Sequence, residues 1–218
     1  MSPSIKEEAL EQLRLDIAFG FDNEEAIFDG IREMFYDEED FDGDWLRQEI
    51  STQYQRHQQE SLQWKRPTDF DRLAKTFDEL IAQEIVCLHK AGYTKQDAEG
   101  DCMDAVHQLL EWGPTPIGYC YYHAQDLARA VDPAIRNLYL GFDSPREDDT
   151  KALVIANKIV TQLIANGFQV NWPGTVDQRI EIVNIDWKKV PDKQSWGIER
   201  LIRLMAKPHI KKPFWKFW

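Results

Sequence analysis

The sequence predicts an α+β protein in which an N-terminal part of about five helices packs on a small mixed sheet, with a C-terminal helix and tail. Apolar residues recur at helical spacing from residue 5 to about residue 112. A Gly-Pro-Thr-Pro break follows, after which short apolar runs alternate with helical segments. We therefore expect three regions: a helical region at residues 1–112, a mixed-sheet region at 113–190, and a basic amphipathic helix with an aromatic tail at 191–218.

Capping residues divide the helical region. Asn23 is a suitable N-cap for the second helix because glutamates fill the first turn after it. The fourth helix is expected to begin after Thr68 and to end near Gly92. Thr94 and Asp97 have the spacing of a capping box for the fifth helix. No period-2 alternation indicates a strand in this region.

Strands and helices alternate in the second region. Strands are expected at residues 117–122, 138–142, 168–172 and 180–185, and helices at 125–131 and 149–166. The order along the chain is therefore βαβαββ. Because strands joined by a helix are normally parallel, we expect parallel pairing with right-handed crossovers at the first two connections. The last two strands flank a Pro-Gly turn and should form an antiparallel hairpin.

The charge balance limits the classes of partner. The chain has 26 Lys and Arg against 38 Asp and Glu, a formal net charge of -12. This excludes a general nucleic-acid binder, because phosphate contacts need clustered cationic side chains, and it suits a basic protein partner. The start of the sequence lacks the basic and apolar regions of a secretory signal, and no window is long and apolar enough for a membrane span. We therefore expect a cytoplasmic protein.

No pattern in the sequence predicts a metal or a cofactor. Cys87, Cys102 and Cys120 lack a Cys-x-x-Cys spacing, so reduced thiols are expected, and the histidines fall in no ligand spacing. Residues 40–44 place carboxylates at the first positions of a calcium loop, but its later ligands are missing. GxSxG, Walker and GxGxxG motifs are absent as well. We interpret the acidic run at residues 37–44 as a solvated connector or as a docking surface for a basic partner.

The last segment of the chain differs in charge from the rest. From Lys193 onward the chain has seven basic residues and one acidic residue, so this segment carries a net charge of +6 and the remainder carries -18. Residues 195–205 have amphipathic spacing, and an aromatic, basic end follows. Membrane association through these aromatic residues is one interpretation. Docking on the acidic part of the same chain is the interpretation that the opposite charges favour.

The segment from Gly118 to Asp126 is expected to be an aromatic strand that delivers His123, Gln125 and Asp126 to a strand-to-helix turn. Ligands tend to bind at such turns because backbone N–H groups are free there. His123 and Asp126 are the candidate catalytic residues, since histidine exchanges a proton near neutral pH and aspartate can orient it. Gln125 and Tyr121 are the candidate substrate contacts. The structural alternative is that Gln125 or Asp126 caps the first turn of the helix while His123 hydrogen-bonds a neighbouring loop.

Five segments carry a resemblance to a known family: residues 68–73, 85–94, 118–127, 138–142 and 170–175. Together the segments resemble a bacterial family of domains of unknown function over roughly residues 15–190. The most specific motif of that family is an aromatic strand followed by His-Gly-Gln-Asp, which here is His123-Ala-Gln-Asp126. The alanine argues against a left-handed backbone at this position. Other members carry clustered cysteines near the equivalent of His89 that look like a metal site, whereas this chain has only Cys87 there. The resemblance implies a fold and a bacterial origin, and no activity.

Two hypotheses of different classes follow. The leading one is a cytoplasmic bacterial interaction or regulatory module whose acidic surface binds a basic partner, and an immunity-type inhibitor of a basic toxin is one version of it. The alternative is an enzyme of the hydrolase or transferase type, with His123 as acid and base, Asp126 orienting it, and Gln125 contacting the substrate. The sequence predicts neither the substrate nor the oligomeric state.

Overall fold

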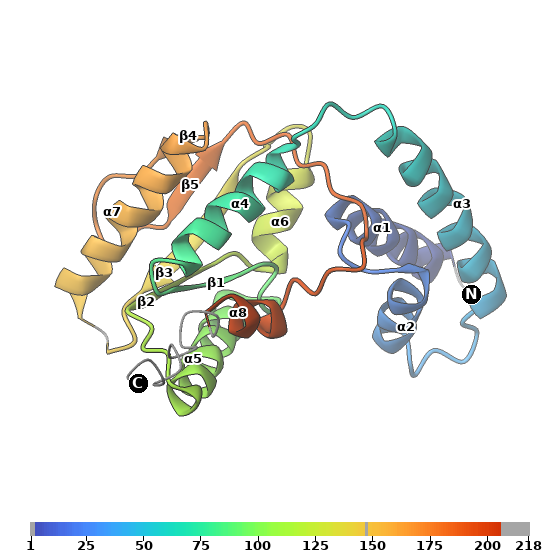
Figure 1. Cartoon of the computed structure of the whole chain (residues 1–218). Coiled ribbons are helices and arrows are strands. Elements are labelled where there is room, and N and C mark those ends of the chain that lie inside the picture. Colours follow the sequence, from blue (N-terminus) through green and yellow to red (C-terminus); the bar gives the residue numbers. More distant parts are fainter. Residues whose placement is uncertain (1–2, 147, 206–218) are drawn as a thin grey trace, which may run out of the picture.

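The computed structural model describes residues 3–146 and 148–205, and within them it confirms an α+β fold with an N-terminal helical region and a C-terminal helix (Figure 1). The helices are α1 (Pro3–Phe19), α2 (Glu24–Met34), α3 (Gly43–Ser61), α4 (Asp69–Ile81), α5 (Lys95–Trp112), α6 (Ala124–Val131), α7 (Asp149–Ala165) and α8 (Ile198–Met205). The strands are β1 (Ile85–Leu88), β2 (Gly118–Tyr121), β3 (Leu138–Asp143), β4 (Gln169–Asn171) and β5 (Ile180–Val183). Among the described residues, no helix has both the length and the apolar character that a membrane span requires.

The strands form one mixed sheet in the order β1-β2-β3-β5-β4. β1 and β2 are parallel, whereas the other neighbours are antiparallel. Side-chain alternation assigns the helices to the two faces of the sheet. A Cβ atom at Gly118 would meet Ile155 of α7, while Tyr121, three residues further along β2, reaches Glu99 of α5. α4 packs beside α7 on the first face, and α6 lies over β3 on the face of α5.

Strand β1 is a correction to the sequence prediction, which placed residues 68–92 in one helix. α4 begins after the Thr68 cap as expected, but it ends at Ile81, and the chain turns at Glu84, whose φ is 65°. The strand Ile85–Leu88 follows and is buried along its whole length. A short, continuous apolar run has no period of two, so its pattern alone does not separate a buried strand from a helix.

The pairing of β2 with β3 is a second correction. The helix between them predicts parallel strands, but the two run antiparallel, with Tyr121 opposite Gly141. α6 has 8 residues, a length of about 12 Å, and a turn at Asp132, closed by the N–H of Arg136, reverses the chain after it. β3 therefore begins beside the end of β2. β3 next pairs with β5, again antiparallel, and not with β4, whereas the expected β4–β5 hairpin is present.

Two apolar cores stabilise the structure. The larger core lies between the sheet and its covering helices, and the smaller one lies among α1, α2 and α3. α1 contributes to both, because Leu13 and Ile17 belong to the smaller core and Phe19 belongs to the larger one. Figure 1 shows α1 between α6 and the outlying helices α2 and α3. These three N-terminal helices, called here the α1–α3 subdomain, are thus joined to the sheet through α1.

The segment after β5 returns to the α1–α3 subdomain. The Trp187 indole donates to the Phe19 carbonyl at 3.2 Å, and Lys189 Nζ donates to the Gly20 carbonyl at 2.8 Å. Three aromatic rings lie around the Lys189 ammonium group, those of Phe21, Phe70 and Trp196. The Lys189 side chain is 1% exposed, and burial lowers its pKa to about 8. The aromatic faces attract the ammonium group and offset part of its lost hydration.

Helix α8 docks on its own chain. It packs against α4 and β1, with Leu201 and Met205 buried. Arg200 adds an ion pair with Asp78 at 2.6 Å. The basic aromatic end that the sequence predicts for the tail, at residues 206–218, lies outside the described residues.

Candidate functional site

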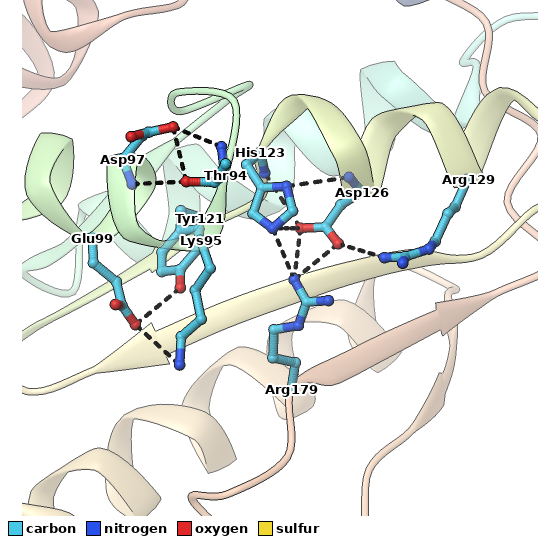
Figure 2. Close-up of polar contacts among 9 residues, drawn as sticks. All are labelled: Thr94, Lys95, Asp97, Glu99, Tyr121, His123, Asp126, Arg129 and Arg179. Atoms are coloured by element: carbon cyan, nitrogen blue, oxygen red, sulfur yellow. Dashed lines mark hydrogen bonds and ion pairs between the residues drawn. The ribbon is translucent and has the colours of Figure 1, made fainter.

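His123 lies at the predicted junction, between β2 and α6, where it is the N-cap residue of the helix. The Asp126 backbone N–H donates to His123 Nδ1 at 3.3 Å, and the His123 backbone N–H donates to the Asp126 carboxylate at 3.4 Å (Figure 2). The two residues therefore satisfy each other's first-turn groups as a capping box does. Ala124 is the first helical residue and does not have a positive φ.

The contacts of the His123 ring indicate its tautomer. Because Nδ1 accepts the Asp126 amide hydrogen, we assign the ring proton to Nε2, which lies 3.0 Å from Asp126 Oδ2. Arg179 Nη1 lies 3.2 Å from the same nitrogen, but both atoms carry hydrogen in this tautomer, so they are only in contact. The ring is 4% exposed, and burial lowers the pKa of His123, so it is neutral at pH 7.

Asp126 is the buried centre of a charge cluster. Its side chain is fully buried, and Arg179 Nη1 donates to both carboxylate oxygens at 2.8 Å. Arg129, one turn further along α6, approaches at 3.5 Å. Burial raises the pKa of Asp126, while Arg179 opposes that effect. The Asp126 carboxylate thus contacts two guanidinium groups, those of Arg179 and Arg129. Both guanidinium groups also lie over the ring of Tyr139.

Nothing in the sequence pattern points to Arg179. It stands in the loop before β5, 53 residues from Asp126 along the chain, and belongs to no motif. Arg129 gives a weak signal, because its spacing of three residues from Asp126 places both on one helix face. The spacing of residues along the chain therefore indicates the contact between Arg129 and Asp126, but not the shorter contact between Arg179 and Asp126.

Tyr121 takes part in a separate set of contacts. Its ring packs against Gly141 of β3, and its hydroxyl donates to Glu99 Oε1 at 3.2 Å (Figure 2). Glu99 also pairs with Lys95 at 3.5 Å. Burial and the nearby Glu99 raise the pKa of Tyr121, so its hydroxyl stays protonated and acts as a donor.

Gln125 is exposed and lines a cavity of about 590 Å³ between α1 and α6. His123, Asp126 and Tyr121 do not line this cavity. The structure therefore brings His123 and Asp126 together and adds Arg179, but it places Gln125 and Tyr121 in different surroundings.

The three cysteines are buried free thiols. Cys87 and Cys120 face each other in the parallel register of β1 and β2, and burial raises the pKa values of Cys87 and Cys102. The thiols of Cys87 and Cys102 therefore stay protonated and unreactive. Within residues 3–146 and 148–205, no group of three or more His, Cys, Asp or Glu side chains has the arrangement of a metal site.

The fold and the site together define an α+β protein in which a buried His123–Asp126 pair, joined by the partly exposed Arg179, fixes the helix after β2, with a cavity between that helix and the α1–α3 subdomain. The chain belongs to the family described as Domain of unknown function (DUF6891), whose profile matches residues 2–190. The predicted resemblance to a family of domains of unknown function is thereby confirmed. Neither the curated proteins nor the solved structures contain a match to the chain.

Proposed function

We propose that the protein is an interaction module that binds a basic protein partner through the acidic surface of the α1–α3 subdomain. The observation that carries this proposal is the distribution of charge. Residues 1–62 contain seventeen Asp and Glu against five Lys and Arg, so they carry the whole net charge of -12, whereas the remaining residues hold twenty-one of each sign. A field confined to one subdomain attracts and orients a partner of opposite charge.

The surface of this subdomain also offers apolar contact area. Met34 is 55% exposed at the end of α2, and Tyr36 is 79% exposed two residues further on. Exposed acidic residues flank them, with Glu33 on one side and residues 37–40 on the other. Methionine and tyrosine are enriched in protein interfaces, where a charged rim surrounds an apolar centre. An inhibitor of the immunity type, which covers a basic toxin, is one version of this function.

Affinity purification with the full-length protein tests the proposal. Glu33, Glu38 and Glu39 are exposed and can be changed together to Gln, and the matched control changes Glu111 to Gln and Asp149 and Asp177 to Asn, all exposed outside the subdomain. We expect a basic protein to be recovered with the wild type and with the control but lost with the first variant. After purification, its binding should weaken as salt is raised. Recovery of no such protein, or equal loss with both variants, would contradict the proposal.

A second candidate function is a hydrolase or transferase at His123. What favours it is a neutral imidazole held against a carboxylate at the end of β2. In that role Asp126 orients His123, whereas Gln125 and Tyr121, the substrate contacts that the sequence predicts, lie in other surroundings and do not border His123. Asp126 occupies the space beside both ring nitrogens, since its N–H donates to Nδ1 and its carboxylate lies 3.0 Å from Nε2, so a substrate would have to displace one of these contacts. Turnover of ester or phosphoester substrates that His123→Gln abolishes would support this function, and unchanged turnover would exclude it.

A further inference from the structure

A cavity of about 590 Å³ lies where the α1–α3 subdomain meets the sheet. One wall comes from α1, and the opposite wall comes from α6 and from the loop after β1. β1 and β2 are parallel, so their carboxyl ends lie at the same edge of the sheet, where ligands commonly bind. The volume falls in the range of small-molecule sites, about 300–1,000 Å³.

The loop after β1 is held in an uncommon conformation beside this cavity. Lys90 and Gly92 both have positive φ, 48° and 54°. The Ala91 N–H donates to the Tyr122 carbonyl, and the Ala124 N–H donates to the Gly92 carbonyl, so the loop is tied to the start of α6. A non-glycine residue in the left-handed region persists only where its surroundings enforce it, and such residues cluster at binding sites.

The α6 end of the cavity carries excess positive charge. Arg129 lines the cavity with a side chain that is 47% exposed, and it reaches Asp126 only at 3.5 Å. Arg179 already holds that carboxylate at 2.8 Å, and the neutral His123 adds no charge. Arg129 therefore has guanidinium donors to offer to an anionic group.

The α1 end carries excess negative charge. Asp16 lines the cavity, and the positive charge that acts on it, that of Lys90, is already paired with Asp22 at 2.5 Å. Gln12 donates to Asp16 Oδ1 at 3.0 Å, and no described residue donates to its other carboxylate oxygen. Burial raises the pKa of Asp16, an effect that an ammonium group beside it would oppose.

From this separation of charge we infer that the cavity binds a small zwitterion, a free amino acid or a short peptide, with its carboxylate at Arg129 and its ammonium group at Asp16. The exposed side-chain amide of Gln125 also lines the cavity. Because this amide both donates and accepts hydrogen bonds, it suits the peptide group of a short peptide. Leu15 and Phe19 supply apolar wall for a side chain. Because α1 and α6 form opposite walls, the ligand would also join the two parts of the chain.

Isothermal titration calorimetry of the full chain with L-phenylalanine and with glycyl-phenylalanine distinguishes the amino acid from the peptide. N-acetyl-glycyl-phenylalanine lacks the ammonium group, and glycyl-phenylalaninamide lacks the carboxylate. We expect saturable binding of at least one zwitterion. Each blocked analogue should bind about ten- to hundredfold more weakly, as the loss of one charge-assisted hydrogen bond implies.

Substitutions assign the two ends of the cavity. Arg129→Gln should weaken binding of the zwitterion by a similar factor, but it should leave the already weak affinity for the carboxamide analogue unchanged. Asp16→Asn should likewise weaken binding of the zwitterion but leave the affinity for the N-acetyl analogue unchanged. Arg14→Gln and Asp177→Asn, at exposed positions that do not line the cavity, are the matched controls. A misfolded variant would lose every probe, so the selective pattern separates lost recognition from lost structure.

The inference is overturned if neither zwitterion gives saturable binding up to about 10 mM, an affinity too weak for a built site. It is equally overturned if the zwitterion binds but both Arg129→Gln and Asp16→Asn leave its affinity unchanged. Neither result would bear on the acidic surface of the α1–α3 subdomain, because the charge-removing variant proposed for that surface changes none of the cavity residues.

Discussion

Arg179 Nη1 lies 2.8 Å from both carboxylate oxygens of Asp126, so a loop before the last strand supplies the main counter-charge for a carboxylate at the start of α6. Asp126 is fully buried, whereas Arg179 is partly exposed. The carboxylate therefore depends on this contact more than the guanidinium does. This asymmetry leads to a first prediction.

Arg179→Gln should lower the free energy of unfolding by about 3–5 kcal/mol, because it leaves a buried carboxylate without its principal partner. Arg129→Gln is the matched control, and since its contact is longer and half exposed it should cost about 1 kcal/mol or less. Urea denaturation measures both. Adding Asp126→Asn to Arg179→Gln should recover part of the loss. Equal costs for the two arginine variants would contradict the asymmetry.

Gly141→Ala should destabilise the protein by about 1–3 kcal/mol, the usual cost of overpacking. An added Cβ would collide with the ring of Tyr121. Gly100→Ala is the control, because a Cβ there meets nothing within 4 Å and the position is inside α5. It should stabilise by about 0.5–1 kcal/mol through helix propensity. Thermal melting of both variants should therefore give shifts of opposite sign.

The buried Lys189 should make stability rise at alkaline pH. Its pKa is about 8 in the folded protein and 10.5 when unperturbed. Between these values the unfolded chain binds more protons, so the free energy of unfolding rises with pH by about 3 kcal/mol and is unaffected below pH 8. Lys189→Met cannot titrate. The difference in unfolding free energy between wild type and Lys189→Met should therefore shift by this amount from pH 8 to 10.5, and a constant difference would refute the prediction.

His89 should make the protein sensitive to acid. It is buried, contacts the Tyr122 hydroxyl at 2.9 Å, and burial lowers its pKa to about 3 from 6.5. As the pH falls from 6.5 to 3, the unfolded chain gains a proton that the folded protein does not, so stability is lost by up to about 5 kcal/mol. His89→Gln keeps a polar partner for Tyr122 but does not titrate in this range. Its acid-unfolding curve should be flatter over this interval.

Local signals in the sequence predict the helix starts well. Asn23, Thr68 and Thr94 are N-caps in the structure, as their spacing indicates, because capping bonds join residues only three apart. Strand pairing is different, since it joins residues far apart in the chain. The buried run of β1 and the antiparallel pairing of β3 accordingly escape prediction.

In the candidate site, too, contacts between residues close in the sequence are predictable and contacts between distant residues are not. The sequence predicts the junction at His123 and the nearness of Asp126, because the two residues are three positions apart at one strand-to-helix turn, but it does not predict that His123 itself is the N-cap. Arg179 and Asp16 are not predictable from spacing, because tertiary packing alone brings them to α6 and to the cavity. The motif alone therefore predicts the position of the site, whereas the residues that contact its side chains are determined by the tertiary fold.

The contacts of Trp187 and Lys189 with the end of α1 have a consequence for the order in which the protein can fold during synthesis. They join residues about 170 positions apart, so α1 leaves the ribosome long before its partners do. The α1–α3 subdomain has its own apolar core and can collapse early. Its attachment to the sheet can be completed only after β5 and the following segment have been made, which places the junction between the two parts among the last structures to form.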